Sequence, residues 1–67
     1  MEHSVISFNC ISKKVVYESL HRSAESAYEE YLENIRIVKR HIRKGEELAV
    51  ARLWEGKIMA FEVIKGE

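Results

Sequence analysis

Apolar residues in the middle of the chain recur at intervals of four and three residues, the spacing of an amphipathic helix with one buried face. Ser23 can cap this helix, because its hydroxyl can accept a hydrogen bond from a free backbone amide. Ser26 and Glu29 have the spacing of a capping box, which would start the helix three residues later. Gly45 can close it in the left-handed conformation. We therefore predict one long helix between Ser23 and Gly45. Its expected buried stripe is Ala24, Ala27, Tyr28, Tyr31, Leu32, Ile35, Val38 and Ile42.

The segment before the helix is rich in β-branched and aromatic residues, which favour strands. Its only polar break is Ser12-Lys13-Lys14. We predict a hairpin in which residues 4–11 pair with residues 15–21. Neither Gly nor Asn lies in the break, so the strongest turn signal is missing and one long strand is the alternative.

The segment after the helix predicts a second hairpin. Leu48–Trp54 and Lys57–Ile64 flank Glu55-Gly56, where the glycine permits a positive φ. A two-residue loop predicts three cross-strand pairs: Leu53 with Ile58, Ala51 with Ala60, and Ala49 with Glu62.

Alternation along these two strands gives the second hairpin two faces. We expect the bulkier face to pack against the helix. It carries Leu48, Val50, Arg52, Trp54, Met59, Phe61 and Val63. The other face also includes Glu62 but is mostly apolar, and nothing in the chain remains to cover it. We therefore expect homodimerisation through its apolar residues, which are Ala49, Ala51, Leu53, Ile58, Ala60 and Ile64.

The order of elements defines the expected fold class. It is a small α+β domain, ββαββ, in which one long amphipathic helix packs on one face of a small antiparallel sheet. A chain of 67 residues forms one domain, residues 1–67, with a thin core. Its 46% hydrophobic and 33% charged residues suit a folded domain.

Charges along the predicted helix are sorted by sign, although the net charge is zero. Acids near the start and bases near the end complement the helix dipole. Sorting also creates like-charge neighbours four residues apart, such as Glu29 with Glu33 and Arg36 with Arg40, which are mildly unfavourable. A partner protein with the complementary pattern would use such sorting. With Ile37 as an apolar anchor opposite the buried stripe, the predicted partner-binding residues are Glu33, Asn34, Ile37, Arg40, His41 and Lys44.

The basic half of the helix also permits an alternative, a nucleic-acid-binding accessory protein. Clustered basic residues are the usual electrostatic footprint of such binding. They are Arg36, Lys39, Arg40, Arg43 and Lys44. The zero net charge disfavours this alternative, because nucleic-acid-binding domains are typically basic.

The chemistry-bearing residues form no recognisable catalytic, cofactor or metal motif. Three scattered glycines cannot make a phosphate-binding loop, and His3, His21, His41 and Cys10 lack the paired spacing of a zinc site. We expect no enzymatic activity, no cofactor and no metal. A single cysteine and the lack of a leader-like start favour a cytoplasmic location. No apolar run approaches the roughly 20 residues that span a bilayer, so we expect no membrane association.

The predicted order, a short extended hairpin, a helix and then the strand–turn–strand of Leu48 to Ile64, resembles small accessory proteins encoded by bacteriophages, including an antitoxin that neutralises a host ribonuclease. The resemblance implies a stoichiometric binder of a bacterial protein, acting in the host cytoplasm. The sequence therefore predicts a non-enzymatic protein-interaction module, of which an inhibitor or antitoxin is the most specific form.

Overall fold

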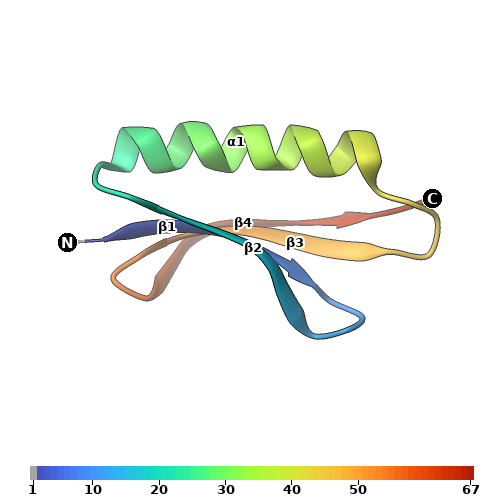
Figure 1. Ribbon diagram of the computed structural model, residues 1–67. Helices are drawn as coiled ribbons and strands as arrows, with labels where there is room; N and C mark the ends of the chain where they lie inside the picture. The colour runs from blue at the N-terminus through green and yellow to red at the C-terminus, as the bar shows by residue number, and fades with distance from the viewer. Residues whose placement is uncertain (1) are drawn as a thin grey trace.

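The computed structural model describes residues 2–67 and has the order β1–β2–α1–β3–β4 (Figure 1). The elements are β1 (His3–Asn9), β2 (Lys14–His21), α1 (Ala24–His41), β3 (Glu47–Trp54) and β4 (Lys57–Lys65). The strands form one antiparallel sheet in the order β2-β1-β3-β4. Helix α1 lies across one face of this sheet, so the predicted ββαββ fold is confirmed.

The side chain of Asn9, the last residue of β1, closes the turn of the first hairpin. The carboxamide oxygen of Asn9 accepts hydrogen bonds from the backbone amides of Ile11 and Ser12, at 2.9 and 3.0 Å. Lys13 completes the turn in the left-handed region, with φ 64°. The chain therefore forms a hairpin here and not one long strand. The pairing of Ser7 with Tyr17 and of Phe8 with Val15 leaves Val16 as a bulge in β2.

Helix α1 begins as predicted and ends earlier than predicted. The hydroxyl of Ser23 accepts a hydrogen bond from the amide of Ser26 at 3.1 Å, which caps the first turn. The last helical residue is His41, because Ile42 is extended with ψ 139°. Gly45 has φ 91° but lies in the connection to β3 and does not close the helix. As a consequence, the two basic residues before it are not part of the helix.

The buried side of α1 is rotated from the predicted stripe. Tyr31, Ile35 and Val38 are buried as expected, whereas Tyr28 and Leu32 remain about half exposed. The complete buried set is Ala27, Tyr31, Asn34, Ile35 and Val38. Asn34 explains the error. The predicted stripe was based on apolar residues alone, so it left out this buried polar residue and was centred to one side of the true buried face.

The core lies between α1 and the two central strands. Val5 of β1 and Val50 of β3 are completely buried, and Ile64 of β4 joins the same cluster as Tyr31. Burial raises the pKa of the Tyr31 hydroxyl, and the Glu62 carboxylate acts in the same direction. The helix is further held to the edge strand by an ion pair of 3.3 Å between Lys39 Nζ and Glu62 Oε2.

A bulge in β4 changes the predicted pairing of the second hairpin. Leu53 pairs with Ile58 as expected, but Arg52 pairs with Ala60, so Met59 is inserted between the two pairs. Beyond this point the side chains of β4 exchange faces. Ala60 and Ile64, predicted on the uncovered face, lie on the helix side, and Ile64 is buried. Phe61 and Val63, predicted beneath the helix, instead lie on the uncovered face.

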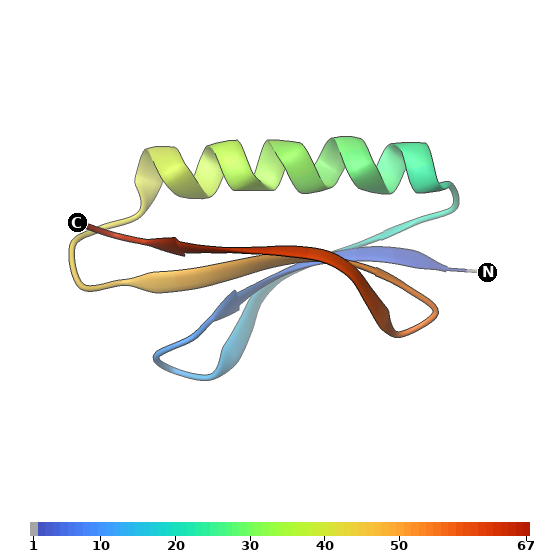
Figure 2. The ribbon, with the colours of Figure 1, turned by 180° about the vertical axis from the view of Figure 1, so that it is seen from behind.

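The sheet is strongly twisted, as both views of the ribbon show (Figures 1 and 2). The turns of the two hairpins lie at opposite ends of the sheet and bend away from α1. The helix therefore spans the middle of one face, and the opposite face is left open between the two turns.

The turn of the second hairpin generates a prediction. Glu55 and Gly56 both have positive φ, 50° and 80°, as a type I′ turn requires. A glutamate is strained in the left-handed region, whereas asparagine adopts it more readily. We expect Glu55→Asn to raise the free energy of unfolding by roughly 0.5–1 kcal/mol in a urea titration. Glu55→Ala is the control, because it removes the same charge without relieving the backbone strain. Equal stabilisation by both variants would contradict this explanation.

Candidate interaction surfaces

The face of the sheet opposite α1, here called the open face, is apolar on all four strands. Alternation and the observed pairing place its residues in rows across the sheet. Phe61, Ile58 and Leu20 are 63%, 62% and 62% exposed. The apolar members of the open face are Ile6, Phe8, Val15, Leu20, Ala49, Ala51, Leu53, Ile58, Phe61 and Val63.

Small and large residues are paired across the two strands at one side of this face. Ala51 of β3 pairs with Phe61 of β4, and Ala49 pairs with Val63. The two alanines therefore form a row of small residues along β3, which the larger Phe61 and Val63 border on one side. Ile6 and Phe8 of β1, opposite the same two alanines, border it on the other side.

Few charges interrupt the open face. Glu18 lies on the edge strand β2, opposite Ile6. Glu47 and Lys65 face each other across β3 and β4 at the far end of the sheet. The centre of the face is therefore apolar, and its charges lie at the margins.

Four of the six residues predicted for self-association lie on the open face: Ala49, Ala51, Leu53 and Ile58. Ala60 and Ile64 do not, because the bulge at Met59 turns them toward α1. Sequence reasoning also missed Phe61 and Val63, the most prominent residues beyond the bulge. Nothing in the residue pattern marks the inserted Met59. Alternation counted from the two-residue loop therefore assigned the residues of β4 beyond Met59 to the wrong faces.

The residues predicted to bind a partner through the helix do not form one patch. Glu33, Arg40 and His41 are exposed on α1, and Glu33 Oε1 lies 3.2 Å from Arg36 Nη2. Lys44 is exposed but lies in the connection after the helix. Asn34 is buried and contributes to the core, so its predicted place on the outer surface is wrong. Ile37 is 46% exposed, but it lies on the flank of α1 that faces β2 and not opposite the sheet.

Ile37 borders a hollow of about 320 Å³ between α1 and the first hairpin. Apolar side chains from three elements form most of its wall. They are Val16, Tyr17, Ile37, Val38 and Leu48, with Ser7, Glu30 and Asn34 as the polar members.

The polar members of this hollow form one hydrogen-bonded cluster. Tyr17 donates its hydroxyl to Glu30 Oε2 at 2.6 Å, and the amide of Asn34 donates to the same carboxylate oxygen at 2.9 Å. Asn34 also donates to the backbone oxygen of Glu30 at 3.1 Å. The hydroxyl of Ser7 donates to Asn34 Oδ1 over 3.4 Å. The cluster ties α1 to both strands of the first hairpin.

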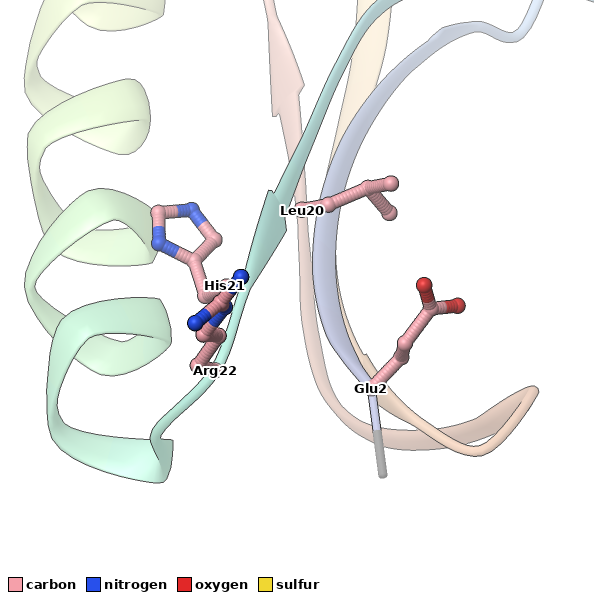
Figure 3. Close-up of a pocket in the computed structure, with 4 residues that line it drawn as sticks. All are labelled: Glu2, Leu20, His21 and Arg22. Atoms are coloured by element: carbon pink, nitrogen blue, oxygen red, sulfur yellow. The ribbon is translucent and has the colours of Figure 1, made fainter.

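A second hollow, of about 570 Å³, lies where β2 leaves the sheet (Figure 3). Leu20 and Glu2 point away from α1, whereas His21 points toward it. His21 Nε2 lies 2.8 Å from Ser19 Oγ and His21 Nδ1 lies 2.7 Å from Ser26 Oγ. The imidazole joins the end of β2 to the first turn of α1. A serine hydrolase would need a carboxylate to orient the ring, and here a second serine occupies that place.

A third hollow, of about 310 Å³, lies at the end of the sheet beneath the start of α1. His3 and Trp54 stack there with ring centroids 5.9 Å apart. Arg52 lies over the ring of Tyr28, with its guanidinium carbon 5.9 Å from the ring centroid. Trp54 thus packs against other side chains at this end of the sheet. Across residues 2–67, no group of three His, Cys, Asp or Glu side chains is placed to hold a metal ion.

The polar cluster beside Ile37 generates a prediction about stability. Asn34→Ala removes the side chain that joins half-buried Glu30 to buried Ser7, and with it the hydrogen bonds to the carboxylate and the backbone oxygen of Glu30. We expect a loss of roughly 1–3 kcal/mol in the free energy of unfolding. Ser7→Ala is the control, because its long hydrogen bond contributes little. Thermal and urea unfolding of both variants measure the difference, and an Asn34→Ala variant as stable as the parent would show that the cluster does not hold the helix.

No helix within residues 2–67 is long and apolar enough to cross a membrane. No protein-family model, curated protein or solved structure matches the chain.

Proposed function

We propose that the protein is a non-enzymatic interaction module that binds another protein chain through the open face of its sheet. The observation that carries this proposal is the exposure of large apolar side chains on both edge strands of this face, Phe61 and Ile58 of β4 and Leu20 of β2, with further apolar residues on the two strands between them. An antiparallel sheet with one face on a core usually presents polar residues on the other. Contiguous exposed apolar surface typically marks a site of protein association.

The energetic argument rests on the side chains that remain in water. Full burial of a Phe or Ile side chain contributes roughly 1.5–3 kcal/mol, and Phe61 and Ile58 are nearly two-thirds exposed. Covering each of them would thus contribute on the order of 1–2 kcal/mol. While these side chains stay in water, this free energy is not gained. A partner protein that covers them would gain it on binding.

The flank of α1 provides a second contact surface in this proposal. Ile37 borders an apolar hollow, with Glu33 on one side and Arg40 and His41 on the other. A partner that inserts an apolar side chain there and presents charges of opposite order would gain specificity from this surface. Tight binding of one protein through two surfaces is consistent with the inhibitor or antitoxin role that the resemblance to phage accessory proteins implies. That role would place the protein in the cytoplasm of a bacterial host.

The nucleic-acid alternative receives less support from the basic residues. Carboxylates lie beside two of the basic residues, Glu33 beside Arg36 and Glu62 beside Lys39, which lowers the positive potential of this side of the helix. The helix also ends at His41, so Arg43 and Lys44 do not extend its basic side.

We therefore expect no binding of mixed-sequence DNA or RNA at about 0.15 M salt in a fluorescence anisotropy titration, a condition that screens weak surface attraction. Phosphate contacts would instead give binding that weakens steeply as salt rises. Submicromolar binding that is lost in the Arg40→Glu, Arg43→Glu double variant would favour the nucleic-acid function over protein binding.

The protein-binding function predicts that capture of a partner depends on the open face. In affinity capture from the native host, Phe61→Ser should retain less than about a tenth of the partner that the parent retains, because a buried aromatic anchor commonly contributes more than 1 kcal/mol. Ile11→Ser is the matched control: Ile11 is 64% exposed but lies in the turn of the first hairpin. Ile37→Glu tests the helix flank separately. Unchanged capture by both Phe61→Ser and Ile37→Glu would refute the two surfaces.

A further inference from the structure

We propose that the protein chain which covers the open face is a second copy of this chain, related by a two-fold axis that runs along the strands between β3 and β4. This inference names the partner of the surface assigned under the proposed function, and it rests on that function. In this arrangement β4 of each copy lies over β3 of the other. Each residue of β4 then contacts, in the other copy, the β3 residue with which it pairs across the strands of its own sheet.

Size complementarity supports this arrangement. Two pairs across β3 and β4 on the open face join an alanine of β3 to a larger residue of β4, Ala51 with Phe61 and Ala49 with Val63. Under the two-fold axis, Phe61 of each copy lies over Ala51 of the other, and Val63 lies over Ala49. Ile6 and Phe8 of β1 lie on the other side of the two alanines. Small residues beside large ones on one surface make that surface self-complementary, as a two-fold contact requires.

Charge complementarity gives independent support. The same axis places Lys65 of each copy over Glu47 of the other, so two favourable pairs form at the end of the contact. Glu18 lies on β2, beyond the overlapping strands, so its carboxylate remains hydrated in the dimer. An axis through the centre of the sheet would instead bring Glu18 against Phe61, which would bury a charge on an aromatic ring at considerable cost.

The sheet order defines how much of the open face this contact covers. The axis places β3 and β4 of one copy over β4 and β3 of the other, so two of the four strands overlap and about half of the face is covered. Two sheets of equal twist stay in contact along their length when their strands run nearly parallel.

The first test is sedimentation equilibrium of the complete chain at micromolar concentrations. We expect a dimer of twice the 7.9 kDa chain mass. Phe61→Ser should raise the dimer dissociation constant by more than about tenfold. Leu20→Ser is the matched control, since Leu20 is equally exposed on the same face but belongs to β2, outside the contact. We expect it to change the constant by less than about threefold. A monomeric parent, or equal effects of the two variants, would overturn the proposed dimer.

A second test separates contacts between chains from contacts within one chain. Lys65→Glu and Glu47→Lys should each weaken the homodimer, because like charges then meet across the axis. When the two variants are mixed, every pair across the axis is again opposite in charge, and association should return to near the parental level. The like-charge pair within each chain persists after mixing, so rescue cannot come from repaired folding. Failure of mixing to restore association would exclude the proposed axis.

The outcomes also separate this inference from the proposed function. A monomeric parent whose capture of a host protein is lost in Phe61→Ser would preserve the function and refute the second copy as its partner. A monomeric parent whose capture is unaffected by Phe61→Ser would refute both. Circular dichroism and thermal melts of each variant confirm that the fold is intact before association is compared.

Discussion

The insertion of one residue in β4 determines which side chains the single helix covers. Side chains alternate between the faces of a strand, so an extra residue exchanges the faces of everything beyond it. The bulge at Met59 brings Ala60, Glu62 and Ile64 toward α1 and sends Phe61 and Val63 to the open face. Ile64 then completes the core beside Val5 and Val50, and Glu62 reaches Lys39. The core and the open face thus result from the same irregularity.

The single helix of the described residues sets the second constraint. Within residues 2–67, α1 covers one face of the four-stranded sheet. The twist of the sheet limits this cover further, because both hairpin turns bend away from α1 (Figures 1 and 2). Small domains with thin cores commonly gain stability by association. An apolar open face on such a domain is therefore consistent with a contact that contributes to folding as well as to function.

A polar cluster orients the helix on this thin core. Asn34 and Ser7 are buried, and with Tyr17 and Glu30 they link α1 to the first hairpin by side-chain hydrogen bonds. Apolar packing alone would permit several rotations of the helix, whereas a buried hydrogen-bonded group is satisfied in only one. The same cluster forms part of the hollow beside Ile37, so the group that fixes the helix also shapes a candidate contact surface.

Local signals in the sequence determined the elements of this protein. Helical periodicity identified α1, Ser23 identified its start, and Glu55-Gly56 identified the second turn. These features depend on neighbouring residues, and local energetics suffice to specify them. Only the tertiary structure decided which faces are buried. The bulge at Met59, the burial of Asn34 and the lateral position of Ile37 depend on contacts between distant segments. The parity of a strand and the rotation of a helix are set by what packs against them, and no short stretch of sequence contains that information.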